Sequence, residues 1–333
     1  MDRRRVFTLL RWIFLAVLIG AGIWYGTAHP QLLQALSQIS IWWLLPLAVL
    51  ILIGKALQGL QLRLLTSIYR IRLSFAEWFG LTVCKSMYGY LLPGRPGAGV
   101  QAVYLKKRHE FSFAHFSSLF AATALIDAGS AASVGLLACV ALHSLVRQVH
   151  PFFSAVFGAV LGACAFGCVI LLFARGVTRY VPTQSGRDFA ERAVEGLGLL
   201  RKNPGILLEV IGLGVARLVF DSGALFVACV AFDLRATFLE AVLMFVLSTF
   251  GMLLPLTPGS IGVNEGIIVA AGGLLGIRAG ELLLAALVRR AIGLSLFFLL
   301  GWAFTHFLLG RFVEPENASD QTGKDKKMCA GDG

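Results

Sequence analysis

Six ionisable residues well inside long apolar stretches of this 333-residue chain are candidates for function. A charge within a bilayer costs several kcal/mol unless it is paired or hydrated, so such residues are binding or coupling candidates by default. Arg289 and Arg290 are adjacent, and on a helix their side chains point about 100° apart, so one can face a cavity while the other pairs with a carboxylate. The charged binding candidates are Glu265, Arg289 and Arg290, and the coupling candidates are Asp127, Arg217 and Asp221.

Other polar residues in the apolar stretches carry simpler interpretations. Arg217 and Asp221 stand one helical turn apart, which is also the spacing of a purely structural ion pair. Lys55 and Lys85 lie nearer the ends of their stretches, and we interpret them as snorkelling to the membrane surface. The cysteines and histidines show no metal-ligand spacing, and no Gly-x-x-x-x-Gly-Lys-[Ser/Thr] loop occurs, so we expect no cofactor.

Two segments rich in proline and glycine interrupt the apolar stretches. Ser86–Val100 contains Leu91-Leu92-Pro93-Gly94-Arg95-Pro96-Gly97, and Ser248–Val263 contains Leu253-Leu254-Pro255-Leu256-Thr257-Pro258-Gly259. At an offset of 162 positions, Ser, an aromatic residue, Gly, Leu-Leu-Pro and Pro-Gly coincide. Gly and Pro cost roughly 1 and 3 kcal/mol in a helix interior relative to Ala, so both segments break their helices. Paired breaks at matching points of two halves are typical of transporters built from inverted repeats.

Each break predicts a polar site. Lipid cannot satisfy the backbone groups that a broken helix leaves unpaired, so these groups must face protein, water or a bound polar ligand. Free N–H groups and the helix dipole favour an anion where the chain restarts as a helix. The guanidinium of Arg95 suits a phosphate, unless it only reaches the cytoplasmic headgroups. We therefore expect the breaks to supply substrate-binding residues, namely Arg95, Gly97, Pro258 and Gly259.

The composition identifies an integral membrane protein. Hydrophobic residues make up 57% of the chain and charged residues only 14%, whereas a soluble domain is about 25% charged. The mean hydropathy is +0.79. The net charge of +11 would suit nucleic acid in a soluble protein. Here the basic residues gather in the loops on one side of the membrane, so we expect no nucleic-acid partner.

The apolar runs predict an all-α polytopic protein with about six full transmembrane helices and two re-entrant helical hairpins. After Pro93 the chain has only about a dozen residues before Lys106, too few to cross, so the first break belongs to a hairpin that returns to its own side.

We favour an uncleaved first span over a signal peptide, and expect the long third run to be tilted or broken near Gly129. The expected spans are Val6–Tyr25, Ile41–Gly59, Phe111–Val146, Pro151–Phe173, Gly205–Phe232 and Glu281–Leu309, and the expected hairpins are Phe75–Tyr104 and Phe238–Leu275.

The basic residues predict the orientation. Of the 29 Lys and Arg, 19 fall on the side of the N-terminus, three on the other side and seven within membrane segments. The positive-inside rule then places both termini in the cytoplasm. The first hairpin would enter from the cytoplasm and the second from outside, so residues 41–146 and 205–309 form an inverted repeat within one transmembrane domain, 1–309. The polar tail, 310–333, we expect to be disordered and cytoplasmic.

These motifs resemble a known family, the flippase-like membrane region of lysylphosphatidylglycerol synthases, which also occurs in stand-alone, hopanoid-associated and glycosyltransferase-associated membrane proteins. The resemblance rests on Leu91–Gly97, on Leu254–Gly266 and on Arg289. It implies that Asn264 belongs to the binding site and that a membrane lipid is the substrate, with a lipid-modifying enzyme or a glycosyltransferase as a partner. The chain differs from the family pattern where Ala98 replaces an acidic residue, Gln101 a basic residue, and Thr123-Ala124 a Glu-Arg pair.

We therefore expect a lipid flippase or lipid transporter of the inner membrane that moves a lipid with an anionic headgroup between leaflets. No soluble aminoacyl-transferring domain and no Asp-x-x-Asp cluster occurs, so we do not expect an enzyme. The alternative is a proton- or ion-coupled transporter of a small anionic solute, for which the same breaks would serve. Transport would run downhill, be coupled to protons through Asp127, Asp221 or Glu265, or be driven by a partner. The sequence leaves the lipid and the oligomeric state open.

Overall fold

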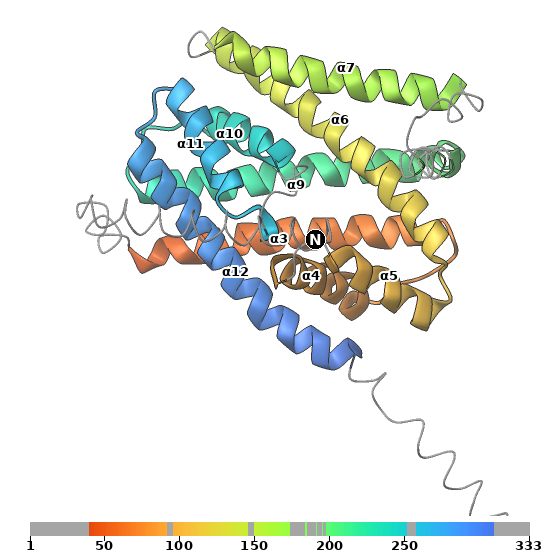
Figure 1. The fold of residues 1–333 in the computed structure, drawn as a ribbon. Helices are drawn as coiled ribbons and strands as arrows, with labels where there is room; N and C mark the ends of the chain where they lie inside the picture. The colour runs from red at the N-terminus through yellow and green to blue at the C-terminus, as the bar shows by residue number, and fades with distance from the viewer. Residues whose placement is uncertain are drawn as a thin grey trace, which may run out of the picture.

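Helices make up every element that the computed structural model describes (Figure 1). The described residues are 40–91, 96–145, 150–173, 198–251 and 258–309, with 184, 191 and 195 as single positions. The predicted first span Val6–Tyr25, Arg95 and the predicted disordered tail lie outside them. The elements are η1 (Ile41–Trp43), α3 (Leu44–Ser67), α4 (Phe75–Leu91), α5 (Pro96–His109), α6 (Phe113–Leu145), α7 (Pro151–Phe173), α9 (Pro204–Ala231), α10 (Phe238–Gly251), η3 (Pro258–Ser260), α11 (Val263–Leu274) and α12 (Ala279–Leu309).

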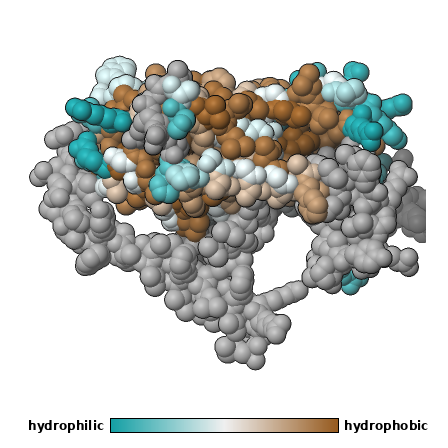
Figure 2. Space-filling view, turned by 90° about the horizontal axis from the view of Figure 1, so that it is seen from above, coloured by the Kyte–Doolittle hydropathy of each residue, from teal (hydrophilic) through white to brown (hydrophobic). Residues whose placement is uncertain are grey.

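Among the described residues, four helical segments are long and apolar enough to cross a membrane: Ile41–Ser67, Phe113–Ser144, Pro204–Ala231 and Ala279–Leu308. Figure 2 shows the apolar surface as a broad band, with hydrophilic residues toward both ends of the molecule. Such a band matches the hydrocarbon layer of a bilayer. The chain is therefore an all-helical, multi-pass membrane protein.

For two of these helices the structure differs from part of the sequence expectation. The helix of the second predicted span does not end at Gly59 but continues to Ser67. The third run is not broken near Gly129, because α6 is one continuous helix from Phe113 to Leu145. A single glycine costs a helix only about 1 kcal/mol relative to Ala, which an alanine-rich helix without proline can absorb.

α4 and α5 form an antiparallel pair, and so do α10 and α11. In the first pair, Glu77 at the start of α4 accepts a hydrogen bond from the Tyr104 hydroxyl at 3.0 Å and bonds to His109, the last residue of α5, at the same distance. In the second pair, Gly251 faces Ile267 of α11. Further along, Gly272 faces Met244 of α10. Each pair therefore returns toward the end at which it began.

The two antiparallel pairs, α4 with α5 and α10 with α11, are called the first and second hairpin below. Both begin with the same cap. The backbone N–H of Ser74 donates to the Glu77 carboxylate at 2.9 Å, and the N–H of Thr237 donates to the Glu240 carboxylate at 2.8 Å. This bond satisfies one backbone donor that the first turn of a helix leaves open. The sequences Ser-Phe-Ala-Glu and Thr-Phe-Leu-Glu thus start the two helices in the same way.

α3 and α9 pack antiparallel through the centre of the molecule. The Gln61 amide donates to the Val210 carbonyl at 3.0 Å, and Gly54, two turns earlier on α3, lies against Asp221 of α9. Because α4 follows the end of α3 and α10 follows the end of α9, the two hairpins open toward opposite ends of the molecule (Figure 1). α4 also packs on α12 and α10 on α6, so each hairpin contacts the last helix of the other half.

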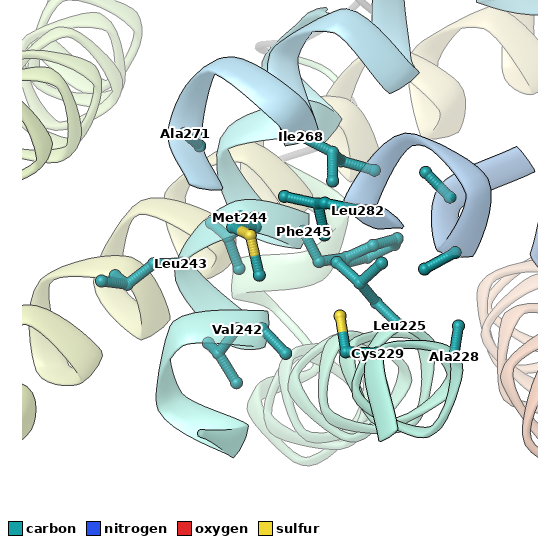
Figure 3. Close-up of a cluster of buried hydrophobic side chains, with 14 of the residues drawn as sticks. Leu225, Ala228, Cys229, Val242, Leu243, Met244, Phe245, Ile268, Ala271 and Leu282 are labelled. Carbon is teal, nitrogen blue, oxygen red and sulfur yellow. The ribbon is translucent and has the colours of Figure 1, made fainter. Parts of the chain in front are cut away.

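The hydrophobic core consists of two separate clusters. The larger cluster is centred on α9, α10, α11 and α12, where Leu225, Met244, Ile268 and Leu282 are fully buried (Figure 3), and it also includes residues of α3, α6 and α7. The smaller cluster surrounds the open end of the first hairpin and includes Trp78 of α4. The larger cluster therefore fills the second hairpin and its neighbours, whereas α4 and α5 of the first hairpin pack into the smaller cluster.

Candidate functional site

A cavity of about 530 Å³ lies between the two halves. Its walls come from α3, α4, α5, α6, α9, α10, α11 and α12, together with η3. Five basic and two acidic residues line it, so its net charge is positive. These residues are Lys55, Lys85, Arg217, Arg289, Arg290, Asp127 and Asp221.

The two hairpins meet at this cavity. Tyr90, near the end of α4, lies against Gly259 of η3. Gly259 has a φ of 59°, and a Cβ there would come within 2.2 Å of the Tyr90 Cδ1 atom, so glycine is required by both backbone and space. Phe297 of α12 stacks on the Tyr90 ring with 6.3 Å between centroids, and the Arg290 guanidinium lies 5.4 Å from the same ring. The Tyr90 ring of the first hairpin therefore lies between η3, at the second break, and α12.

Arg290 holds the second break in place. Its guanidinium donates to the Glu265 carboxylate and to the backbone carbonyls of Gly259 and Ser260. Glu265 also accepts the N–H of Gly262 at 2.7 Å, at the start of α11. Arg290 is 9% exposed and Glu265 only 3%, so the pair is buried and these extra hydrogen bonds help to offset its desolvation. A protein carboxylate therefore takes the place at this helix start where we expected the substrate anion.

Arg289 points away from this pair and forms no ion pair with any described residue. Its guanidinium carbon lies 5.1 Å from the centre of the Phe245 ring, a cation–π contact. Its Nε atom is buried without a hydrogen-bond partner, and so is the Oδ1 atom of Asn264, which also lines the cavity. Buried polar atoms are nearly always bonded. These two atoms therefore indicate where a bound polar group would sit.

Charges from three helices meet in the middle of the cavity. Arg217 of α9 pairs with Asp127 of α6 at 3.1 Å, and the Gln61 amide of α3 donates to the other oxygen of Asp127 at 3.4 Å. Asp221 lies against Gly54 and interacts electrostatically with Lys55, Arg217 and Arg289. The structural pair considered for Arg217 and Asp221 does not form among these residues, because Arg217 reaches α6 while Asp221 faces α3.

Lys55 and Lys85, which we interpreted as snorkelling residues, both line the cavity. The Lys55 ammonium donates to Gln58 at 3.3 Å and lies 4.8 Å from the Phe297 ring centre. A signal for this was present in the sequence. Lys55, Gln58 and Gln61 follow helical spacing and form one polar stripe on an otherwise apolar helix.

The remaining predicted site residues have different positions. Gly97 lines the cavity, and a Cβ there would come within 2.0 Å of the Lys85 carbonyl oxygen, so this glycine lets α5 approach the backbone of α4. Pro258 begins η3. Arg95 lies outside the described residues. Among the predicted residues that the structure describes, the cavity brings together Gly97, Gly259, Asn264, Arg289, Arg290, Asp127, Arg217 and Asp221.

The cavity, the two broken helices and the apolar spans lie within a region that a family model recognises. The model is described as the lysylphosphatidylglycerol synthase TM region, and it matches residues 10–301. A search of curated proteins finds no match. The family match covers most of the chain, including both breaks and every described charge in the cavity. The chain therefore belongs to the family of the lysylphosphatidylglycerol synthase transmembrane region.

Proposed function

We propose that this protein moves a lipid with an anionic headgroup between the leaflets of the inner membrane. The observation that carries the proposal is the cavity, where five basic and two acidic side chains gather beside both helix breaks. The main barrier to lipid movement is the transfer of a charged headgroup through hydrocarbon. A polar, positively charged cavity within the membrane lowers this barrier for an anionic headgroup.

The packing of α6 supports a lipid over a soluble anion. α6 packs on α7, α9 and α10. Long side chains connect it to α3 and α4 instead: Gln61 reaches Asp127, and the Lys85 ammonium lies 5.5 Å from the Phe120 ring centre. The cavity occupies the space between these helices. A headgroup can therefore enter the cavity beside α6 while its acyl chains remain in the bilayer.

The proposed mechanism uses the two halves as an inverted repeat, with both termini in the cytoplasm. Its support is the antiparallel packing of α3 and α9 and the opposite directions of the two hairpins. Cysteine labelling tests it in a variant without native cysteines. An exposed cysteine at Lys202→Cys should resist an impermeant thiol reagent in intact cells, whereas one at Arg235→Cys should react. The reverse pattern would remove the proposed orientation.

Lipid movement is tested with the purified full chain in vesicles that contain a trace of fluorescent phosphatidylglycerol. Chemical quenching of the outer leaflet should proceed to nearly all of the label, and Arg289→Gln should slow movement at least about tenfold, the loss expected for one charged hydrogen bond. The exposed Arg235→Gln is the matched control and should move lipid at the original rate. Vesicles in which only the outer-leaflet label is quenched would contradict the proposal.

A proton- or ion-coupled transporter of a small anionic solute is the second candidate, since the positive cavity would bind such an anion too. The same vesicles separate the two functions, because a solute transporter accumulates a labelled anion without moving lipid. We propose a transport role without catalysis, in association with a lipid-modifying enzyme or a glycosyltransferase. Asp127 and Asp221 remain the candidates for coupling, because both line the cavity.

A further inference from the structure

Neither cavity carboxylate among the described residues is available to a positively charged headgroup. Asp127 is bonded to Arg217 and to the Gln61 amide. Asp221 is subject to the charges of Lys55, Arg217 and Arg289. An ammonium group placed beside Asp221 would therefore lie among cations, and like charges repel strongly where little water screens them.

In the wall formed by α5 and α6, Ala98, Gln101, Thr123 and Ala124 are uncharged. The charge that α6 adds to the described lining, Asp127, is paired with Arg217. Gln101 is only 4% exposed and donates its amide to the Leu81 carbonyl at 3.3 Å. The Thr123 hydroxyl donates to a carbonyl of its own helix and can still accept a hydrogen bond. This wall can hydrogen-bond uncharged polar groups, but it cannot neutralise an amine.

Beside the second break, the cavity residues Arg289 and Arg290 each have a buried Nε donor without a partner, and Asn264 has a buried acceptor without one. Asn264 is 6% exposed, and its Oδ1 atom is buried without a partner. The Arg289 Nε–H is buried without a partner as well. A guanidinium suits a phosphate oxygen, and an amide oxygen accepts a hydrogen bond from a hydroxyl. A phosphate with a neighbouring hydroxyl group satisfies the Arg289 donor and the Asn264 acceptor without adding another positive charge to the cavity.

We infer that the cavity selects a phosphodiester whose headgroup is uncharged and hydroxylated, and excludes headgroups that carry an amine. Arg289 binds the phosphate, and Asn264 accepts a hydrogen bond from the headgroup hydroxyl. The inference rests on the proposed function for its assignment to a lipid. A water-soluble glycerol phosphodiester has the same chemistry, and the experiment distinguishes the two sources.

Native mass spectrometry of the purified full chain tests the selectivity directly. The chain is incubated with equal amounts of phosphatidylglycerol, phosphatidic acid, phosphatidylethanolamine and phosphatidylserine, and retained lipid is counted after detergent removal in the gas phase. Phosphatidylglycerol should be retained in preference to the two amine lipids. Equal retention of phosphatidylglycerol and either amine lipid would overturn the inference.

Two variants locate the selectivity. Asn264→Leu should lower the retention of phosphatidylglycerol relative to phosphatidic acid roughly fivefold, the value of one hydrogen bond, while phosphatidic acid itself is retained as before. Thr123→Glu places a carboxylate in the uncharged part of this wall and should raise the retention of both amine lipids relative to phosphatidylglycerol. If Asn264→Leu does not fold, Thr123→Glu decides the question from another helix of the cavity wall. Unchanged ratios in Thr123→Glu would overturn the assignment.

Vesicle assays separate this inference from the proposed function. If phosphatidylglycerol is retained selectively but no lipid moves in vesicles, the headgroup selectivity stands and the flippase function fails. Uptake of labelled glycerophosphoglycerol without lipid movement would assign the same selectivity to a water-soluble ligand. Conversely, if phosphatidylglycerol and phosphatidylethanolamine move at equal rates, the flippase function stands and the selectivity is refuted.

Discussion

The two halves of the molecule share their order of helices but differ in how closely the last two helices pack. In the second half, α12 packs on both α11 and α9, and their contacts form the filled core of Figure 3. In the first half, α5 and α6 touch little, and the space between α6 and α3 is part of the cavity. The molecule is therefore closed on the side of the second hairpin and open on the side of the first.

The register of the two halves explains part of this difference. The breaks align at an offset of 162 positions, but the residues on either side of them align at an offset of 163. At this second offset, Ser74 and Glu77 correspond to Thr237 and Glu240, and Val100 corresponds to Val263. At that offset, Glu265 corresponds to Ala102 and Arg290 corresponds to Asp127. The buried pair that ties α11 to α12 thus has no counterpart between α5 and α6. Asp127 is paired with Arg217 of the other half instead, and this leaves α6 separated from its own hairpin.

The largest effect should follow from breaking the buried pair of the closed half. Arg290→Gln leaves the Glu265 carboxylate buried without its cation and removes two bonds to the break, so it should lower the free energy of unfolding by roughly 3 to 5 kcal/mol. Unfolding in mixed detergent micelles measures this. The double variant with Glu265→Gln should be more stable than Arg290→Gln alone. A melting temperature for Arg290→Gln equal to that of the wild type would show that the pair does not close this half.

Glycine substitutions at the two breaks should have the next largest effect, for different reasons in each half. Gly97→Ala would push α5 from the α4 backbone, and Gly259→Ala would strain a positive φ and displace Tyr90, each at a cost of roughly 1 to 3 kcal/mol. Gly99→Ala and Gly266→Ala are the controls, because a Cβ at either position meets no other atom within 4 Å. In thermal unfolding in detergent, Gly97→Ala and Gly259→Ala should lower the melting temperature more than the two controls do. Equal losses in all four variants would remove the argument for close contact at the breaks.

The ion pair of the open half should contribute less than that of the closed half. The side chains of Arg217 and Asp127 are 18% and 25% exposed, so water in the cavity screens them, and Arg217→Gln should cost only about 1 kcal/mol. A double-mutant cycle with Asp127→Asn measures the coupling. A coupling energy as large as that between Arg290 and Glu265 would mean that the first half is held as tightly as the second.

The smallest effect should come from the helix caps, where the halves are alike. Ser74→Ala removes a hydroxyl that donates to the Glu77 carboxylate, and Thr237→Ala removes one that accepts the N–H of Glu240. Both variants leave the glutamates, so each should cost about 0.5 kcal/mol, the low end for a lost cap. Hydrogen exchange at the first turns of α4 and α10 gives a local measurement. Since the caps use the same local sequence, unequal exchange would show that the surrounding packing decides even this local feature.

The sequence alone predicted the class of protein and the position of the breaks. Composition and apolar run length identify a membrane protein because the bilayer requires both, and proline with glycine marks the breaks because these residues are costly in a helix interior. The adjacent Arg289 and Arg290 could be assigned to different directions from helix geometry alone. The family could also be suggested from the motif around Pro258 and Glu265.

Only the tertiary structure decided which charges meet. Arg217 stands one turn from Asp221, yet it pairs with Asp127, 90 positions away, because α6 and α9 are neighbours and Asp221 faces α3. Lys55 lines the cavity rather than the surface for the same reason: α3 packs centrally, where a lysine cannot reach water outside the bundle. Apolar helices of similar composition do not encode their neighbours in local sequence. The break residues were therefore determined by the chain, whereas the cavity that surrounds them arises from how its helices pack.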